Sequence, residues 1–330
     1  MFFCYSGTPV TGCFTLRRPS VVHPSAKNPA TSTIVVKSGV EYANAYESMR
    51  RVLDAAYLRK IRSYDRVVIK INLCAARPPE TGAITHPLFL DSVLRLLRES
   101  MDSIDVYVVE SDSRVAQPDL SIKWFGFLPV LERWKASYLN LSRAEVVTKK
   151  IHGRYLGEVR VPKIMEDAFF ITLPKLKTNL GTGITCCLKN QFGCLPEIEK
   201  DKYHSHIDDV IVDVNLAMKP DLCIVDAITA MGGELGPGLG TPIPLRTVVY
   251  GEDPVAVDAF CAKLMGFNPW LIGHIRKASQ TGVGTLHYVT IGNDILAVDP
   301  ETSKLKMALF RLGSWLNARN SPAYYPDRST

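Results

Sequence analysis

The chain has 330 residues, 46% of them apolar, which is enough for a sizeable core and excludes disorder throughout. Its net charge of +6 arises largely in residues 1–40, because residues 41–330 carry 35 Lys and Arg against 33 Asp and Glu. This near-neutral body argues against nucleic-acid binding through bulk charge. Apolar runs such as Leu222–Ile228 are too short to cross a bilayer, so we expect no membrane partner.

Residues 1–32 are rich in Ser, Thr and Pro and contain no acidic residue. This composition is compatible with a transit peptide or an over-extended start codon. Residues 1–16 lack the Arg-rich amphipathic pattern of transit peptides, so we expect a disordered extension.

The eight cysteines lack the dense, even spacing of a secreted disulfide scaffold, which favours a reducing, cytoplasmic location. No C-x2-C pair is present, so the chain has neither a zinc-ribbon nor a ferredoxin-type cluster motif.

Strands and helices alternate from about residue 33. The expected strands are Thr33–Lys37, Arg66–Leu73 and Ile104–Glu110, and helices are expected at Glu41–Lys60 and Pro87–Glu99. Short apolar strands alternating with helices indicate right-handed crossovers. The pattern therefore predicts an α/β fold with a mostly parallel, twisted, Rossmann-like sheet covered by helices.

The alternation continues in the second half of the chain. The expected elements are helices near Ser121–Lys135 and His206–Met218 and at Pro254–Met265 and Pro269–Thr281, with strands at Glu158–Val161, Ala168–Leu173, Leu222–Ala227, Arg246–Tyr250 and Tyr288–Gly292. A Gly- and Pro-rich stretch, Met231–Pro244, is predicted to be a lid, a ligand-facing loop or a plain turn. We expect one α/β domain over residues 33–295, with lobes at about 33–150 and 151–295, and a C-terminal tail at 296–330.

The segment Pro174–Pro196 has the densest set of polar residues. It follows an apolar strand, and its polar residues are Lys175, Lys177, Thr178, Asn179, Thr182, Thr185, Lys189 and Asn190, among glycines at 181, 183 and 193. Ligands of open α/β sheets bind beyond the carboxyl ends of strands, and glycines let backbone N–H groups approach an anion. The segment predicts a loop that binds phosphate or carboxylate, and a solvated basic loop is the alternative. It matches neither the Walker A motif nor G-x-G-x-x-G, so no nucleotide is indicated.

Lys70 and Asn72 lie in an otherwise apolar strand. A buried lysine without a partner is costly, so Lys70 either emerges at the strand end or pairs with a carboxylate. We expect both residues to bind the ligand. Thr85 and His86 precede the helix at Pro87, and either one can serve as its N-cap.

Carboxylates recur at strand ends and inside one apolar helix. Glu110, Asp112 and Asp226 follow strands, where they are site residues, caps or turn residues. Asp258 is surrounded by Val, Ala and Phe, so it is expected to be buried with a hydrogen-bonding or cationic partner. Asp226 and Asp258 are the catalytic candidates among these residues.

His204 and His206 form an H-x-H pair before an expected helix. Histidine transfers protons near neutral pH, so His204 is a catalytic candidate. Alternatives are a metal site formed by the pair, or a cap on the next helix.

Cys186, Cys187 and Cys194 lie in the Pro174–Pro196 segment, and Cys74 ends the Lys70 strand. Thiols that converge there can hold a metal cluster or exchange disulfides, although their spacing matches no cluster motif. The alternative is that they are small buried hydrophobic residues.

Several motifs resemble the domain of unknown function 362 family over residues 35–292. They are Val68-Ile-Lys-Ile-Asn72, Leu173-Pro-Lys-Leu-Lys-Thr178, Lys189-Asn-Gln-Phe-Gly193, His204, Pro220-Asp-Leu222, Val225-Asp226, Ala230-Met231, Gly236-Pro237 and Asp253-Pro-Val-Ala-Val-Asp258. The resemblance implies an iron–sulfur-associated redox role, since such domains are often joined to a ferredoxin-type module with two four-iron clusters. The sequence contains no such module, so we expect a separate ferredoxin-like partner. Family members often have small residues near Cys186 and at Cys187.

The first functional hypothesis is an oxidoreductase that acts on an anionic, phosphorylated or carboxylated small molecule. Lys175, Lys177 and Lys189 bind the anion in this hypothesis, and His204 or Asp258 transfers protons. One alternative is non-redox phosphoryl or acyl chemistry with a divalent ion on Asp112, Asp226 or Asp258. The other is an anion-binding protein without catalytic activity.

Overall fold

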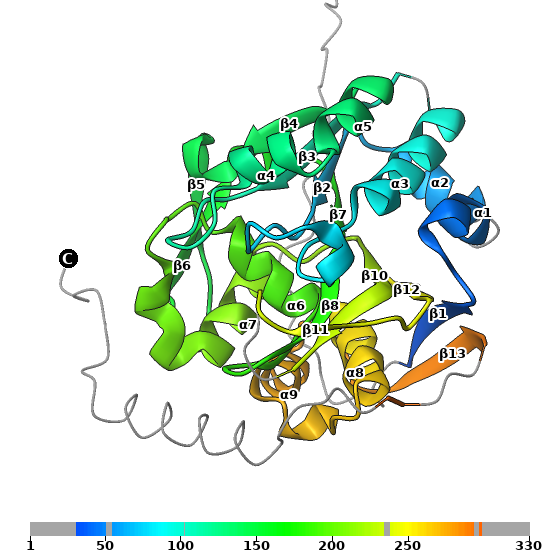
Figure 1. Ribbon diagram of the computed structural model, residues 1–330. Helices are drawn as coiled ribbons and strands as arrows, with labels where there is room; N and C mark the ends of the chain where they lie inside the picture. The colour runs from blue at the N-terminus through cyan, green and yellow to red at the C-terminus, as the bar shows by residue number, and fades with distance from the viewer. Residues whose placement is uncertain (1–30, 51–54, 102, 234–237, 294–296, 299–330) are drawn as a thin grey trace, which may run out of the picture. The chain divides into compact units, whose positions relative to one another are not determined.

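The computed structural model describes residues 31–50, 55–101, 103–233, 238–293 and 297–298. One sheet of eleven strands organises these residues (Figure 1). Its main path runs in the order β13 (Tyr288–Gly292), β1 (Ser32–Ser38), β12 (Thr247–Gly251), β10 (Leu222–Gly232), β7 (Phe169–Thr172), β2 (Arg66–Lys70), β3 (Asp105–Glu110) and β4 (Ser137–Asn140). The strands from β10 to β4 are all parallel. The predicted mostly parallel α/β fold is therefore confirmed.

Three short strands extend this sheet beside the far half of β10. β8 (Lys175–Asn179) pairs with β10 in parallel, β9 (Gly183–Thr185) is antiparallel to β8, and β11 (Thr241–Ile243) is antiparallel to β10. β5 (Val146–Lys150) and β6 (Glu158–Pro162) form a separate antiparallel pair. Strands from both expected lobes thus join a single sheet.

Helices cover both faces of the sheet. The first face packs against α1 (Ala45–Arg50), α2 (Ala55–Ile61), α3 (Pro87–Ser100), α4 (Pro118–Trp124) and α5 (Phe127–Arg133). The second face packs against α6 (Cys187–Asn190), α7 (Ile207–Ala217), α8 (Pro254–Leu264) and α9 (Gly273–Gln280). In Figure 1, α3 and α5 lie above the sheet and α8 and α9 lie below it.

Each strand supplies both core layers because successive side chains point to opposite faces. In β10, Leu222 and Ile224 belong to the first layer, and Cys223 and Val225 belong to the second. The sequence therefore shows continuous apolar runs, as expected for parallel strands buried on both sides.

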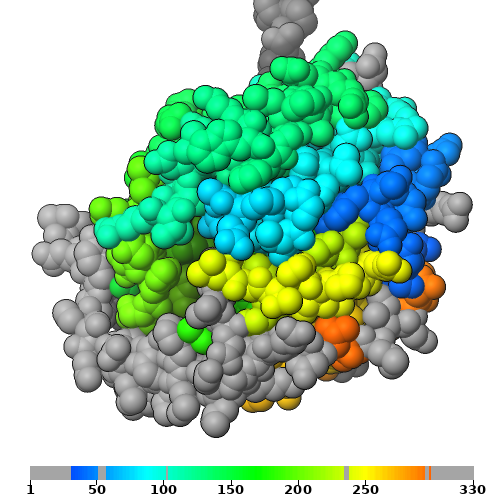
Figure 2. Space-filling model, in the orientation of Figure 1, coloured from blue at the N-terminus to red at the C-terminus, as the bar shows by residue number. Residues whose placement is uncertain are grey.

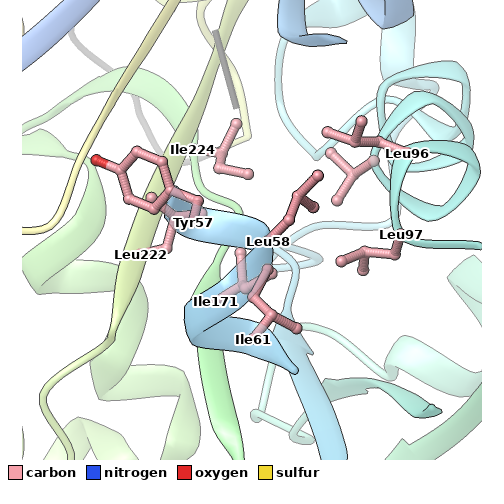
Figure 3. A pocket seen from close by; sticks show the side chains of 9 residues that line it. Tyr57, Leu58, Ile61, Leu96, Leu97, Ile171, Leu222 and Ile224 are labelled. Carbon is pink, nitrogen blue, oxygen red and sulfur yellow. The ribbon is translucent and has the colours of Figure 1, made fainter. Parts of the chain in front are cut away.

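Packing under α2 leaves one small gap of about 10 Å³ between α2, α3 and the sheet (Figure 3). Side chains such as Leu58, Leu97 and Ile171 line it. A space of this size holds about one water molecule and offers it no polar partner from those apolar side chains. We regard it as a packing defect and not as a ligand site.

The strand order reverses between β2 and β7. From β2 the chain proceeds through α3 to β3 and then to β4 on one side, whereas β7 and β10 lie on the other side of β2. Lys70 at the end of β2 and Thr172 at the end of β7 are register partners. Ligands of doubly wound folds bind outside the strand ends at such a reversal.

Several predicted boundaries are wrong. The single helix Glu41–Lys60 is divided into the 3-10 helix η1 (Tyr42–Asn44), α1 and α2, and residues 51–54 lie outside the described part. The helix Ser121–Lys135 is two helices, because Gly126 between them adopts a left-handed φ of 81°. The strand Arg66–Leu73 ends at Lys70.

The Pro174–Pro196 segment is not a loop. It contains β8, β9, α6 and the 3-10 helix η5 (Gln191–Cys194), because β8 finds backbone partners on the long strand β10. Likewise, Met231–Pro244 contains the end of β10 and all of β11, and residues 234–237 lie outside the description.

The expected N-terminal extension and C-terminal tail fall almost entirely outside the described residues. Within the described ranges, none of the helices has the length and apolar character needed to span a membrane.

Candidate functional site

A cleft of about 680 Å³ lies beyond the carboxyl ends of β2 and β3. Its walls come from residues after β2, residues after β3, the β8–β9 turn, α6 with η5, and the 3-10 helix η6 (Lys200–His206). On the face drawn in Figure 2, the light-blue residues after β2 lie between the blue-green α4–α5 region and the yellow β10–β11 hairpin. The cleft is therefore next to the reversal of strand order, where a ligand is expected.

Lys70 and Glu110 form a buried ion pair in the cleft wall. Lys70 Nζ lies 2.6 Å from Glu110 Oε1, and both side chains are at most 5% exposed. The ammonium also donates to the carbonyl oxygen of Ile71 at 2.7 Å, and Glu110 Oε2 accepts from the N–H of Leu73 at 2.8 Å. The lysine charge is thus compensated within the protein.

Asn190 links this pair to the reversal of strand order. Its Nδ2 donates to the carbonyl oxygen of Lys70 at 3.1 Å and to Thr172 Oγ1 at 2.9 Å. Its Oδ1 accepts from Asn72 Nδ2 at 3.1 Å and from Lys70 Nζ at 3.4 Å. Asn190 is buried, so these contacts hold α6 against the ends of β2 and β7.

Lys189, unlike Lys70, has no carboxylate partner among the described residues. Its side chain is partly buried in the cleft wall, with Nζ 5.8 Å from the centre of the Phe192 ring. In the part of the chain that the structure describes, no hydrogen-bond acceptor or carboxylate contacts this ammonium. Burial lowers the pKa of Lys189 to about 8.

Lys200 is a second cleft lysine without a carboxylate in ion-pair contact among the described residues. Its Nζ donates to the carbonyl oxygen of Asp112 at 2.6 Å. Burial lowers its pKa to about 8, although the nearby charge of Glu110 acts in the opposite direction.

His204 and Thr185 also line the cleft. His204 is exposed, and burial of part of its ring followed by the charge of Lys189 lowers its pKa. Thr185 is buried, and its Oγ1 has no hydrogen-bond partner among the described residues. His206 instead stacks on Tyr155, so the H-x-H pair does not converge on the cleft.

Lys175 and Asp226 form an ion pair outside the cleft. Lys175 Nζ donates to Asp226 Oδ2 and to the hydroxyl oxygen of Tyr42, each at 2.8 Å, and both charged side chains are 0% exposed. The N–H of His86 donates to the same carboxylate at 3.1 Å, and the His86 side chain caps α3. The expected anion-binding and catalytic roles of Lys175 and Asp226 therefore have no support from their position.

Lys177 and Thr178 are also absent from the cleft walls. Lys177 Nζ donates to Cys74 Sγ at 2.8 Å and to the carbonyl oxygen of Ala83 at 2.5 Å. Thr178 Oγ1 donates to the carbonyl oxygen of Gly233 at 2.7 Å. Cys74 itself is partly buried and does line the cleft.

Asp258 receives two hydrogen bonds at the start of α6. Its carboxylate oxygens accept from the N–H of Cys187 at 2.7 Å and of Leu188 at 3.0 Å. Burial raises the pKa of Asp258 well above its ordinary value. Asp258 lies outside the cleft, so it and His204 do not form one catalytic group.

The thiols considered for a metal cluster do not converge. Cys74 lines the cleft, Cys194 donates to Gln191 Oε1 at 3.4 Å, and Cys186 lies beside Cys187 in the second core layer. These four residues therefore do not fit an iron–sulfur cluster. The three aspartates considered for a divalent ion are also separate, since the Asp112 carboxylate accepts from Asn140 at 3.0 Å.

The structure thus divides the predicted site residues into two sets. Those that line the cleft are Lys70, Asn72, Thr185, Lys189, Asn190 and His204, and those that lie elsewhere are Lys175, Lys177, Thr178, Asp226, Asp258, Cys186, Cys187 and Cys194. Sequence reasoning missed Lys200, which belongs to a charged run typical of solvent-exposed surface.

The comparisons with known proteins cover the same region. A family model described as "Domain of unknown function (DUF362)" matches residues 67–263. The thylakoid-associated protein sll1697 of Synechocystis sp. is 26% identical over 234 residues, which is 68% of this chain and 70% of that protein. The family match runs from β2 into α8 and includes every segment that lines the cleft.

Proposed function

The chain belongs to the DUF362 family, and on this premise we propose that it is an enzyme whose cleft binds a small organic anion through Lys189. The resemblance identified from the motifs is thereby confirmed. The observation that carries the proposal is the Lys189 ammonium, which faces the cleft without an acceptor or carboxylate among the described residues.

Electrostatics supports an anionic ligand. Removing an ammonium from water without a partner is unfavourable, and the lowered pKa of Lys189 reflects that cost. A phosphate or carboxylate beside Nζ compensates the charge and returns the pKa toward its usual value. Lys200, with its own lowered pKa, provides a second positive group in the same cleft.

The walls also contain apolar side chains such as Leu73 and Phe192. Small-molecule sites combine apolar walls with a few polar groups that orient the ligand. We therefore propose a ligand with an apolar portion next to its anionic group. The hydroxyl of Thr185 is available to form one hydrogen bond with it.

His204 is the proposed proton-transfer group. Its lowered pKa favours a neutral imidazole at pH 7, which can accept a proton from a bound substrate. The carboxylates of Asp226 and Asp258 are engaged in internal hydrogen bonds, which leaves them less suited to this role.

We retain an oxidoreductase as the proposed reaction class, with electrons from a separate ferredoxin-like protein. Cys74 supports a redox role, since it is the described cysteine that lines the cleft. Metal-assisted phosphoryl or acyl chemistry has less support, because Asp112, Asp226 and Asp258 contact different partners. We also propose a cytoplasmic location, which the free thiols of the described cysteines support. The name of the Synechocystis relative gives a thylakoid association for that protein.

A ligand screen tests the proposal. Thermal shifts are measured with phosphorylated and carboxylated metabolites for the wild-type protein, Lys189→Met and Lys202→Met. Lys202 is the matched control, because its Nζ also lies over an aromatic ring, 4.8 Å from the centre of Tyr203, but outside the cleft. We expect a stabilising anion whose effect is lost only in Lys189→Met. Equal shifts in all three proteins would contradict an anion site at Lys189.

A bound anion is then tested for turnover. His204→Gln is expected to retain binding and to lose conversion of the ligand. The wild-type protein is assayed with and without reduced ferredoxin. If it binds the anion but converts it under neither condition, the non-catalytic alternative is favoured.

A further inference from the structure

Four cysteines meet in the second core layer, outside the cleft. Cys186 and Cys187 precede and begin α6, Cys223 lies on β10, and Cys261 lies on α8, and all four are 0% exposed. Cys186 Sγ and Cys187 Sγ are 3.9 Å apart. The Cys186 thiol also contacts Cys261, and the Cys187 thiol contacts Cys223.

The Asp258 carboxylate lies at the same place. One ligand atom from each of Cys186, Cys187 and Asp258 falls within 4.8 Å of the other two. Across the described chain, no lysine, arginine or histidine forms an ion pair with Asp258, which accepts two backbone N–H groups. Among the other buried carboxylates, Glu110 and Asp226 have lysine partners, and Asp213 accepts the backbone N–H groups of residues 154–156. A buried carboxylate without a cation is unfavourable, so this position lacks a compensating positive charge.

We propose that Cys186, Cys187 and Asp258 bind one zinc-type metal ion. Structural zinc sites are closed, tetrahedral and rich in cysteine. With Zn–S distances of about 2.3 Å, tetrahedral geometry separates two sulfurs by roughly 3.8 Å. The distance of 3.9 Å between Cys186 Sγ and Cys187 Sγ agrees with this value.

Binding replaces thiol protons with the metal ion. The ligating thiols become thiolates, their protons pass to solvent, and the ion supplies the positive charge that Asp258 lacks. Sulfurs already in contact leave room for one ion between them and not for a cluster of several irons. The site is independent of the cleft, so it can stand if the proposed function fails.

The first test measures metal content. The chain is purified without a metal-affinity tag and with Cys4 and Cys13 replaced by Ser, so that residues outside the described part do not contribute. We expect about one equivalent of zinc per chain from elemental analysis, lost in Cys187→Ser and in Cys186→Ser. Cys194→Ser is the matched control, because Cys194 is equally buried but its thiol donates to Gln191 and is not among the clustered ligand atoms, so this variant should keep the metal.

A second measurement covers variants that fail to fold. The metal in the wild-type chain is exchanged for Co²⁺, and the absorption spectrum is recorded. Intense sulfur-to-cobalt charge-transfer bands and tetrahedral d–d bands are expected. A wild-type chain that purifies without metal and gives no such bands overturns the proposal, as does equal metal loss in Cys194→Ser. In either case the four thiols are only small buried side chains of the core.

Discussion

Asn190 donates a hydrogen bond to the carbonyl oxygen of Lys70 at 3.1 Å, which joins α6 to the last residue of β2. The same amide group donates to Thr172, so one side chain connects the two strand ends at which the strand order reverses. Its replacement is therefore expected to affect both stability and the shape of the cleft.

Asn190→Ala should lower the free energy of unfolding by about 3 kcal/mol or more, because buried donors and acceptors lose their partner. Asn190→Asp keeps the size but removes both donated bonds, so it should be destabilising as well. Urea denaturation measures both changes. A loss below about 1 kcal/mol in both variants would show that solvent replaces these hydrogen bonds.

Lys175 and Asp226 allow a second stability prediction. Lys175→Met leaves a buried carboxylate without its cation, and we expect a loss of about 3–5 kcal/mol. Lys60→Met is the control, since Lys60 and Glu252 form a pair with 40% and 53% side-chain exposure and should contribute less than about 1 kcal/mol. Chemical denaturation compares the two. Similar small losses would indicate that the Lys175 pair adds no net stability.

The lowered pKa of Lys189 predicts a pH dependence for anion binding. The ammonium is protonated below about pH 8, so affinity should be constant on the acid side of that value. Above it the affinity should fall, by up to roughly tenfold per pH unit, as the charge is lost. Dissociation constants from pH 6 to 10 test this.

Lys189→Arg should reduce that fall, because a guanidinium stays charged over this range. The part that persists is expected from Lys200, whose pKa is also about 8. In the absence of ligand, deprotonation of Lys189 has the opposite effect on the stability of the fold from its effect on anion affinity. The folded protein releases this proton near pH 8 and the unfolded chain releases it near the usual lysine value, so this group adds stability as pH rises between them. An affinity that rises above pH 8 would contradict a protonated Lys189 as the binding group.

Gly193 predicts a steric effect in the cleft wall. A Cβ at this position would lie 2.8 Å from Lys70 Nζ and 2.9 Å from Glu110 Oε1. Gly193→Ala should therefore displace the buried pair and cost about 1–3 kcal/mol of stability. Gly157→Ala is the control, because a Cβ there meets nothing within 4 Å. Thermal unfolding of the two variants checks the difference. Equal melting temperatures would mean that Lys70 and Glu110 can move aside without loss of stability.

Local sequence patterns predicted the elements that are apolar or carry clear end signals. β2, β7 and the first half of β10 are continuous apolar runs, and α8 begins where Asp253 precedes Pro254. β8 was missed because Lys175 and Lys177 are typical of a surface loop. Their burial depends on Asp226, Ala83 and Cys74, which lie far away in the sequence.

The same limitation applies to the candidate site. The spacing of glycines and lysines was sufficient to predict Lys189 and Asn190 as site residues, and both line the cleft. No local pattern shows that Asp258 binds the amides of α6, or that Cys223 and Cys261 meet Cys186 and Cys187. These contacts depend on the crossing of β10, α6 and α8, which only the assembled sheet defines.

Because β7 lies between β2 and β10, the chain cannot be cut between its two halves without breaking the sheet. A fragment that ends near residue 150 would lack β7 and leave one side of β2 as an open, apolar edge. Such edges pair with other chains, so the fragment should aggregate instead of folding as a half-protein. The residues around the cleft also come from both halves, so neither fragment would retain it. A fragment that preserves the cleft must therefore keep residues 70–207 together.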